Sequence, residues 1–196
     1  MNCKSILNVV AVAVVAVVAA VFCIGCVVEP DNYTYTGRTV TIGGSTWMAE
    51  NLNRATANSK CYDNDASNCA KYGRLYTWAA AKSACPAGWH LPSDAEWTEL
   101  TDAVGGALTA GTKLKATSGW NDDGNGTDQY GFSALPGGYG SSGGNFYDAG
   151  YRGYWWSATE VGAYYARVRL MLYNYEGVSG DINNLTYLFS VRCVQN

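Results

Sequence analysis

The chain has few basic residues and a single histidine. Its 196 residues include 13 Lys and Arg against 16 Asp and Glu, and His90 is the sole histidine. Nucleic-acid binding depends on clustered cations that displace counterions, so this balance argues against a nucleic-acid partner. The single histidine and the lack of a CxxC pair also argue against a zinc site formed by the cysteines. The sequence has no G-x-S-x-G nucleophile motif and no repeat with a period of roughly 20 to 50 residues.

Residues 1–25 are predicted to be an export signal and not part of the fold. Lys4 precedes an almost unbroken apolar run from Ile6 to Ile24, which is typical of secretory signals. The run ends in FCIGC, which resembles the lipobox of bacterial lipoprotein precursors and predicts lipidation at Cys26. The alternative is an uncleaved transmembrane helix, because about 20 apolar residues span a bilayer. Either interpretation places the rest of the chain outside the cytoplasm.

The exported part divides into a short tether and one domain. Residues 26–39 are predicted to hold the lipidated cysteine and a polar linker without helical or strand periodicity. Residues 40–196 form the domain, which is long enough to bury about two-thirds of its unfolded surface. Loss of the signal removes one of the 13 basic residues, Lys4, and leaves 12 against 16 acidic residues. The exported chain is therefore mildly acidic.

Four cysteines follow the predicted lipidation site: Cys61, Cys69, Cys85 and Cys193. An even number of cysteines in an exported domain predicts disulfides, here two. Three pairings exist, and we favour Cys61–Cys69 with Cys85–Cys193. The first pair closes a small loop, and the second ties the middle of the chain to its last strand.

The first half of the domain shows patterns for strands and then helices. Alternating apolar residues on either side of Gly43-Gly44 predict a hairpin over 39–52. An Ala-rich segment at helical spacing predicts a helix over 74–84, ended by Cys85-Pro86. A second helix is expected over 94–104, opened by a capping box of Ser93 and Glu96.

Glycine-rich turns and apolar strands dominate the second half. Residues 117–150 have the composition of turns and short strands, and apolar runs at 154–159, 164–172 and 187–194 indicate buried or half-buried strands. Helices that come early and strands that come late predict an α+β fold with a mainly antiparallel sheet.

Several stretches in this order resemble one known family. They are TIGGSTWMAENLN, CYDNDASNC, YGRLYTWAAA, CPAGWHLPSDAEW, GTDQYGFSALPGG, GYWWSATE and FSVRCV. Together they cover nearly all of residues 40–196 and are similar to the Fibrobacter succinogenes major paralogous domain. This resemblance implies an exported bacterial protein, often a lipoprotein, and implies no particular reaction.

A more remote likeness is to C-type lectin-like domains, whose fold the formylglycine-generating enzymes share. In that fold a cysteine that ends one helix precedes a G-x-x-L strand and an acidic second helix, and pairs with a cysteine in the final strand. The corresponding positions here are Cys85, Gly88, Leu91, Glu96 and Cys193. The likeness implies a C-type-lectin-like domain with the favoured long disulfide. The Trp-Asn-Asp triplet of calcium-binding lectins stands at 120–122, far upstream of Cys193, and the C-terminal region lacks the reactive cysteine pair of the enzymes.

Few residues suggest catalysis. His90 is a candidate acid or base, but it lies in a short strand without a nucleophile motif and is better interpreted as a hydrogen-bonded structural residue. Glu96 and Glu99 have the spacing of neighbours on one helix face, which suggests a retaining glycosidase pair. Because Glu96 is already assigned to the capping box, we predict no catalytic residue and no enzyme.

The segment from Asn121 to Asp128 is the best candidate for an ion site. Oxygen ligands at Asn121, Asp123, Asn125 and Asp128 resemble the start of a calcium loop. Phe132 occupies the position of the usual bidentate glutamate, and an Asx-rich turn explains the same residues. Calcium is therefore a tentative cofactor. A weaker calcium candidate is the short cysteine loop, with Asp63, Asn64, Asp65 and Asn68.

Tyrosines interleaved with Gly, Ser and Asn suggest a recognition surface. Tyrosine and tryptophan offer a large amphipathic contact area with few rotatable bonds. The predicted ligand-binding residues are Tyr139, Tyr147, Tyr151, Tyr154, Tyr173 and Tyr175, and recognition is expected through loops at 137–151 and 173–185. The alternative is that these rings fill the core of a glycine-rich sheet. Trp155 and Trp156 should point to opposite faces of a strand, so at most one of them is exposed.

These observations predict a binding module at the cell envelope. The lipid on Cys26 would anchor it to a membrane, the outer membrane or the cell surface, where it would recognise a glycan or a protein. One alternative is a structural envelope protein without a specific ligand, and another is an enzyme that acts on polysaccharide.

Overall fold

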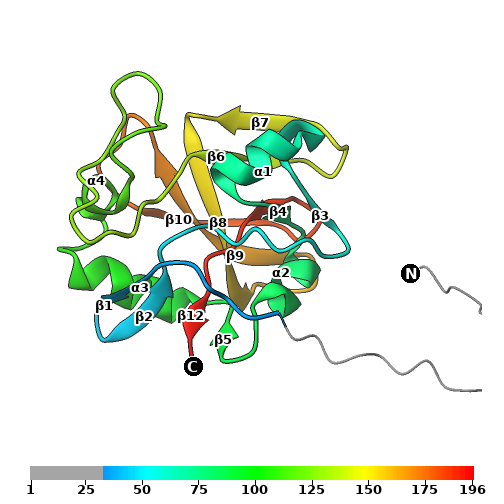
Figure 1. The fold of residues 1–196 in the computed structure, drawn as a ribbon, viewed down its shortest axis with the longest axis horizontal. Coiled ribbons are helices and arrows are strands. Elements are labelled where there is room, and N and C mark those ends of the chain that lie inside the picture. Colours follow the sequence, from blue (N-terminus) through cyan, green and yellow to red (C-terminus); the bar gives the residue numbers. More distant parts are fainter. Residues whose placement is uncertain (1–32) are drawn as a thin grey trace, which may run out of the picture. The chain divides into compact units, whose positions relative to one another are not determined.

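In the computed structural model of the protein, residues 33–196 are described (Figure 1). The predicted export signal and Cys26 lie outside the described residues. The first elements are β1 (Thr39–Ile42), β2 (Ser45–Met48), β3 (Ser59–Lys60), η1 (Tyr62–Asn64), α1 (Ala66–Tyr72), β4 (Leu75–Tyr76), α2 (Trp78–Ala84), β5 (Trp89–His90), α3 (Asp94–Ala103) and α4 (Ala110–Leu114). The later ones are β6 (Gly137–Gly140), β7 (Phe146–Ala149), β8 (Arg152–Glu160), β9 (Tyr165–Leu172), β10 (Ser179–Asn184), β11 (Phe189–Ser190) and β12 (Val194–Gln195). The predicted α+β class is confirmed.

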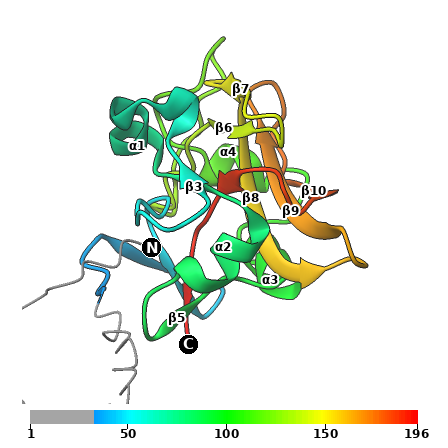
Figure 2. The ribbon, with the colours of Figure 1, turned by 90° about the vertical axis from the view of Figure 1, so that its right-hand side faces the viewer.

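Two sheets organise the domain. The smaller has the order β1-β2-β12-β5, and its β1-β2 hairpin turns at Gly43-Gly44 as predicted. The larger follows the path β10-β9-β8-β11-β4-β3, and β6 and β7 join it beside β8. Figure 2 shows α2 and α3 at the end of the domain where β5 and the C-terminus lie, with α1 at the other end, near β6 and β7. Most pairings are antiparallel, as predicted, and the exceptions are those of β8 with β11 and with β6.

The central strand β8 separates two hydrophobic cores. Side chains of successive strand residues point to opposite faces, so Trp155 packs with Trp97 and Met171 while Trp156 packs with Phe189. Trp155 and Trp156 both have 0% of their surface exposed. The prediction of opposite faces is confirmed, and both faces are covered.

Local sequence explains where two helices begin. Ser93 Oγ accepts from the Glu96 amide at 3.2 Å, and Glu96 Oε2 accepts from the Ser93 amide at 2.7 Å. This capping box opens α3 where it was predicted. The helix expected over 74–84 instead begins at Trp78, after Thr77 as its N-cap. The start at residue 74 was wrong because Leu75 and Tyr76 form β4, which pairs with β3 and β11.

Two further corrections concern the elements expected from sequence. Residues 33–196 contain four α-helices and not two, because α1 begins inside the short cysteine loop and α4 lies after the predicted second helix. The last apolar run is two short strands, β11 in the larger sheet and β12 in the smaller. Residues 191–193 cross from one sheet to the other.

Both favoured disulfides are present. Cys61 and Cys69 have Cα atoms 4.9 Å apart, and Cys85 and Cys193 have theirs 5.9 Å apart. The second bridge joins the residue after α2 to the residue before β12. The middle of the chain is thereby fixed to its C-terminal end.

A fully buried arginine connects the segments between the two sheets. Arg192 donates to the backbone carbonyls of Met48, Phe132 and Ser133 and to Asn51 Oδ1, which is 2.9 Å from its Nη2. Trp155 Nε1 donates to the same Asn51 oxygen at 2.8 Å. No carboxylate accepts a hydrogen bond from Arg192 within the described chain. Burial lowers the pKa of Arg192 to about 9, so the guanidinium stays charged at neutral pH and depends on these neutral oxygens.

Part of the predicted tether packs on the domain. Tyr33 and Tyr35 contact the core on the α2 side, and the Tyr35 ring meets Trp89 edge-on with 5.5 Å between centroids. Packing therefore begins several residues before position 40.

Candidate functional site

The structure divides the predicted tyrosines into two groups. Tyr139 on β6, Tyr147 on β7 and Tyr154 on β8 form one cluster with two residues from the last part of the chain, Tyr187 and Phe189. We call these five residues the tyrosine cluster. The remaining predicted residues, Tyr151, Tyr173 and Tyr175, have no ring contact with the cluster.

Tyr139 is the centre of the tyrosine cluster. Its ring is stacked near parallel to those of Tyr147, at 5.3 Å, and Tyr187, at 6.0 Å. It also meets the Tyr154 ring edge-on at 5.3 Å. Stacked and edge-on pairs at these distances are favourable arrangements for aromatic side chains. The cluster is thus a preformed row of rings from four strands or their connections.

The members of the cluster differ in exposure. Tyr147 has 43% of its surface exposed, and Tyr139 and Tyr187 are half-buried. Tyr154 is only 7% exposed and belongs to the core beneath them, as does Phe189. Of the predicted tyrosines here, Tyr139 and Tyr147 therefore offer ring surface to a ligand, and Tyr154 mainly supports them.

A small groove combines these rings with polar side chains. Its volume is about 100 Å³, and it is lined by Tyr139, Tyr154, Asp181, Asn183, Tyr187 and Phe189. We call it the tyrosine groove. Asp181 and Asn183 come from β10 and lie opposite Val168 and Ala166 of β9, which belong to the same core as the cluster. Strand pairing therefore places an acid and an amide on the face that bears the rings.

Burial and nearby charges raise the pKa of two phenols in the groove, Tyr139 and Tyr154. Burial raises the pKa of Tyr139, and the nearby Asp148 carboxylate raises it further. Burial also raises the pKa of Tyr154, and this outweighs the opposing effect of Arg152, whose Nη1 lies 3.2 Å from the Tyr154 hydroxyl. Arg152 in turn pairs with Asp148, with 3.5 Å between Nε and Oδ2. At neutral pH both hydroxyls can therefore donate as well as accept hydrogen bonds.

The second tyrosine group lies outside this groove. Tyr151 and Tyr173 meet edge-on at 5.3 Å, and the Tyr173 amide donates to the Tyr151 carbonyl at 2.9 Å. Tyr151 and Tyr175 are 40% and 36% exposed. This group pairs the residue before β8 with the segment after β9, and none of its three tyrosines lines the tyrosine groove.

The residues predicted to bind ligand did not include four that line the groove: Asp181, Asn183, Tyr187 and Phe189. Asp181 and Asn183 do lie within the predicted recognition loop 173–185, but that segment contains the strand β10 and is not a loop throughout. The same spacing in two segments could have identified them. Tyr187 and Phe189 are two residues apart in an apolar run, and Asp181 and Asn183 are two residues apart in the segment before it. Residues at this spacing share a face in a strand. Which faces meet depends on the pairing of β8 with β9 and β11, and the sequence alone does not specify that pairing.

Two of the four candidate calcium residues, Asn125 and Asp128, use their side-chain oxygens in turn hydrogen bonds. Asn125 Oδ1 accepts from the Trp120 amide at 3.0 Å. Both Asp128 carboxylate oxygens accept from Ser133, each at 2.6 Å. Asp123 has a positive φ of 58°, and the Gly124 amide donates to the Asn121 carbonyl at 2.9 Å. The Asx-rich turn accounts for these contacts, and among residues 33–196 no three His, Cys, Asp or Glu side chains gather to hold a metal ion.

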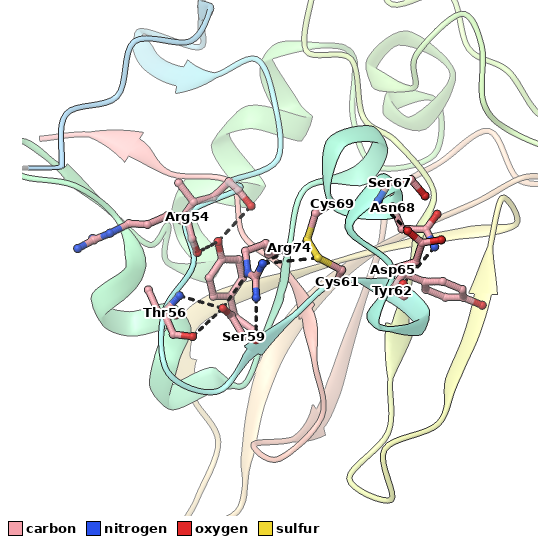
Figure 3. Close-up of a disulfide and its surroundings, with 12 residues drawn as sticks. Arg54, Thr56, Ser59, Cys61, Tyr62, Asp65, Ser67, Asn68, Cys69 and Arg74 are labelled. Atoms are coloured by element: carbon pink, nitrogen blue, oxygen red, sulfur yellow. Dashed lines mark hydrogen bonds between the residues drawn. A yellow bond between two sulfur atoms is a disulfide. The ribbon is translucent and has the colours of Figure 1, made fainter. Parts of the chain in front are cut away.

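The short cysteine loop is also organised by its own hydrogen bonds (Figure 3). Asp65 caps α1 by accepting from the Ser67 amide at 2.8 Å, a bond that lowers the pKa of Asp65. Asn68 Nδ2 donates to the Tyr62 carbonyl at 3.0 Å, while Asp63 and Asn64 have positive φ angles. The Tyr62 ring packs against Phe146 of β7 at 5.4 Å. The loop therefore supports the hairpin that carries Tyr139 and Tyr147.

His90 has a structural position at the start of α3. Its Nε2 lies 2.7 Å from Glu96 Oε1, and its Nδ1 lies 2.7 Å from Asn196 Oδ1. Glu96 is also held by the Ser93 amide and hydroxyl. The ring links β5, α3 and the C-terminal residue, as expected for a hydrogen-bonded structural histidine. Glu99 has no side-chain hydrogen bond within the described part of the chain.

Lowering the pH should weaken the hydrogen bonds that Glu96 accepts and so reduce the stability of the fold. Burial acts to raise the pKa of Glu96, but bonds from Ser93 and His90 outweigh it and the net shift is downward from 4.5. A carboxyl with a lowered pKa in the folded state stabilises the protein above its unfolded pKa, and this contribution disappears as the pH falls through the folded value. We expect Glu96→Gln to cost about 1 kcal/mol at pH 7 and progressively less below pH 4.5. Urea unfolding at several pH values measures this difference, and Glu99→Gln should change little. An equal cost for Glu96→Gln at pH 7 and pH 3 would contradict the assignment.

The comparisons with known proteins concern the domain as a whole. A family model described as the Fibrobacter succinogenes major domain matches residues 40–195. No curated protein and no solved structure matches the chain, so the lectin-like assignment stays a prediction. Within residues 33–196, none of the helices is both long and apolar enough to cross a bilayer.

Proposed function

The chain belongs to the Fibrobacter succinogenes major domain family, and on that premise we propose that it is an exported, lipid-anchored module that binds glycans through the tyrosine groove. The anchor is inferred from the lipobox-like sequence before Cys26. The binding function is inferred chiefly from one arrangement, the stacked rings of Tyr139 and Tyr187 beside Asp181 and Asn183. The proposal includes no reaction.

The chemistry of the groove suits a sugar. The C–H face of a pyranose packs on an aromatic ring, and its hydroxyls need acceptors and donors at the ring's edge. Asn183 supplies an amide that can accept as well as donate. The Asp181 carboxylate accepts from the Ile182 amide at 2.8 Å and from Asn183 Nδ2 at 3.3 Å, which leaves acceptor capacity for a hydroxyl.

The groove is small and receives only part of a ligand. Its volume of about 100 Å³ is below the roughly 300 to 1,000 Å³ of sites that enclose a whole small molecule. It therefore admits one edge of a larger ligand. A saccharide chain can place the edge of one unit there while the rest extends along the exposed ring of Tyr147.

Removing a ring from the groove should weaken glycan binding. For the purified full-length protein on a glycan array, we expect Tyr187→Ala to lower the affinity for the best ligand by about tenfold, since one aromatic contact contributes about 1 kcal/mol or more. Asp181→Asn should also lower affinity, because it exchanges acceptor capacity for a donor. Titration of the selected glycan measures both effects.

The matched control is Tyr164→Ala, which removes a tyrosine that is 70% exposed and does not line the groove. It should leave the affinity unchanged. Silence across the array, or equal affinities for wild type and Tyr187→Ala, would refute glycan binding at this groove. Capture of a protein by wild type but not by Tyr187→Ala would instead identify a protein ligand.

A further inference from the structure

A second, larger cavity lies apart from the tyrosine groove. Its volume is about 440 Å³, within the range usual for small-molecule sites. Its walls come from the segment after β2, the end of α1 and the loop between α4 and β6. It shares no lining residue with the tyrosine groove. We call it the polar cavity.

The floor of the polar cavity is rigid. Asn51 lines it, and its side-chain oxygen is shared by Arg192 and Trp155 while its Nδ2 donates to the Tyr72 carbonyl at 2.9 Å. Gly73, which also lines the cavity, packs so closely on Asn51 that a Cβ there would lie 2.8 Å from Asn51 Cβ. The cavity is therefore built on fixed side chains and would need no rearrangement of its floor to accept a ligand.

Two basic side chains line the polar cavity, Arg38 and Lys71, and of these only Lys71 lacks a carboxylate partner among the described residues. Arg38 and Glu50 pair at the rim, with 3.6 Å between Nε and Oε1. The Asp128 carboxylate is held by Ser133. Lys71, whose ammonium lies 4.6 Å from the centroid of the Tyr72 ring, has no carboxylate within 4.0 Å in the described chain. Arg192 adds a further positive charge beneath the floor.

Uncharged polar groups beside Lys71 also lack partners. Asn53, Thr117 and Ser118 line the cavity and are exposed. None of their side chains has a hydrogen bond to another part of residues 33–196. One amide and two hydroxyls can each donate and accept, which matches the hydroxyls of a polyol.

We propose that the polar cavity binds a small hydroxylated carboxylate, of the class of an acidic monosaccharide. The ligand carboxylate pairs with Lys71, and its hydroxyls bond to Asn53, Thr117 and Ser118. A neutral sugar leaves Lys71 unpaired. A phosphate monoester carries more negative charge at neutral pH, which the cavity's two carboxylates, Glu50 and Asp128, oppose.

Ligand-observed NMR titration of the full-length protein tests this site. Galacturonate is the probe, galactose is its neutral counterpart, and inorganic phosphate is the simple anion. We expect galacturonate to bind at least about tenfold more tightly than either of the others, which corresponds to one charge-assisted contact. The proposal would be overturned by equal binding of galacturonate and galactose, or by tighter binding of phosphate. It would also be overturned if galacturonate did not bind at tens of millimolar, roughly the weak limit of specific affinity.

Substitutions of the lining residues test whether the ligand binds in the polar cavity. Lys71→Gln should weaken galacturonate binding by about tenfold and leave galactose binding unchanged. Lys60→Gln is the matched control, because Lys60 is also exposed but does not line the cavity. Thr117→Val replaces an exposed hydroxyl with a methyl group of similar size and should weaken galacturonate binding without changing the melting temperature. The site would be refuted if both Lys71→Gln and Thr117→Val left the affinity for galacturonate unchanged. Tyr187→Ala, which tests the tyrosine groove, should not change the affinity for galacturonate.

Discussion

Removal of the Cys85–Cys193 disulfide is expected to lower the free energy of unfolding by about 5 kcal/mol. The bridge joins residues separated by 108 positions, and a crosslink stabilises a protein by restricting its unfolded chain, more strongly for longer loops. The double variant Cys85→Ala/Cys193→Ala should show this loss in urea unfolding. Both cysteines are replaced because a single substitution would leave a reactive thiol.

The other disulfide provides the matched comparison. Cys61 and Cys69 are separated by 8 positions, so Cys61→Ala/Cys69→Ala should cost only about 2.5 kcal/mol on the same loop-length relation. Cys193 is fully buried, and its replacement also removes packing. Comparing the oxidised and reduced forms of the Cys61→Ala/Cys69→Ala variant separates that effect, because this variant keeps both Cys85 and Cys193 and has only their bridge to lose. If the short bridge proved as stabilising as the long one, the loop-length explanation would be wrong.

Replacement of the buried arginine should have an effect of similar size. Arg192→Met is expected to lower the free energy of unfolding by about 3 to 5 kcal/mol. The substitution keeps an apolar chain of similar length, but it leaves Asn51 Oδ1 and the carbonyls of Phe132 and Ser133 without this donor in the interior. A buried acceptor that loses its partner retains the cost of its desolvation.

Two variants make the arginine prediction specific. Arg192→Lys should lie between wild type and Arg192→Met, because an ammonium keeps the charge but cannot reach all of these acceptors as a planar guanidinium does. Arg38→Met makes the same change at a side chain that is 62% exposed and should cost less than about 1 kcal/mol. Urea unfolding measures all three, and a cost below about 1 kcal/mol for Arg192→Met would show that the buried hydrogen bonds contribute little.

Much of the fold could be predicted where short-range physics determines it. The capping box of Ser93 and Glu96 and the hairpin at Gly43-Gly44 depend on residues within a few positions of each other, and both predictions are confirmed. The disulfide pairing was predicted because only three alternatives existed. The opposite directions of Trp155 and Trp156 follow from strand geometry alone.

The remaining features depend on contacts between distant segments. Leu75 and Tyr76 have helical spacing with the residues that follow, but they pair with β3 and β11, over 100 residues away in the latter case. Arg192 shows no local sign of burial, since its acceptors come from Met48, Asn51 and the loop at 132–133. A polar residue in an apolar run can face solvent or a buried network, and only the tertiary structure distinguishes these.

The candidate site shows the same division. Tyrosine enrichment drew attention to β6 and β7, yet composition could not separate Tyr139, at the groove, from Tyr151, outside it. Asp181 and Asn183 lie within the predicted segment 173–185 but were not singled out, because an acid and an amide in a strand have no distinctive local pattern. The polar cavity was missed entirely, since its walls come from three segments that are distant in sequence.

The outer strand β10 has a consequence for how copies of this protein behave when crowded. It forms one free edge of the larger sheet, and exposed edges can recruit strands from neighbouring molecules. Here the Asp181 carboxylate is exposed and already accepts from the Ile182 amide at 2.8 Å. A charged side chain that occupies a backbone donor discourages edge-to-edge aggregation. Molecules held at high local density would thereby stay separate instead of growing into fibres.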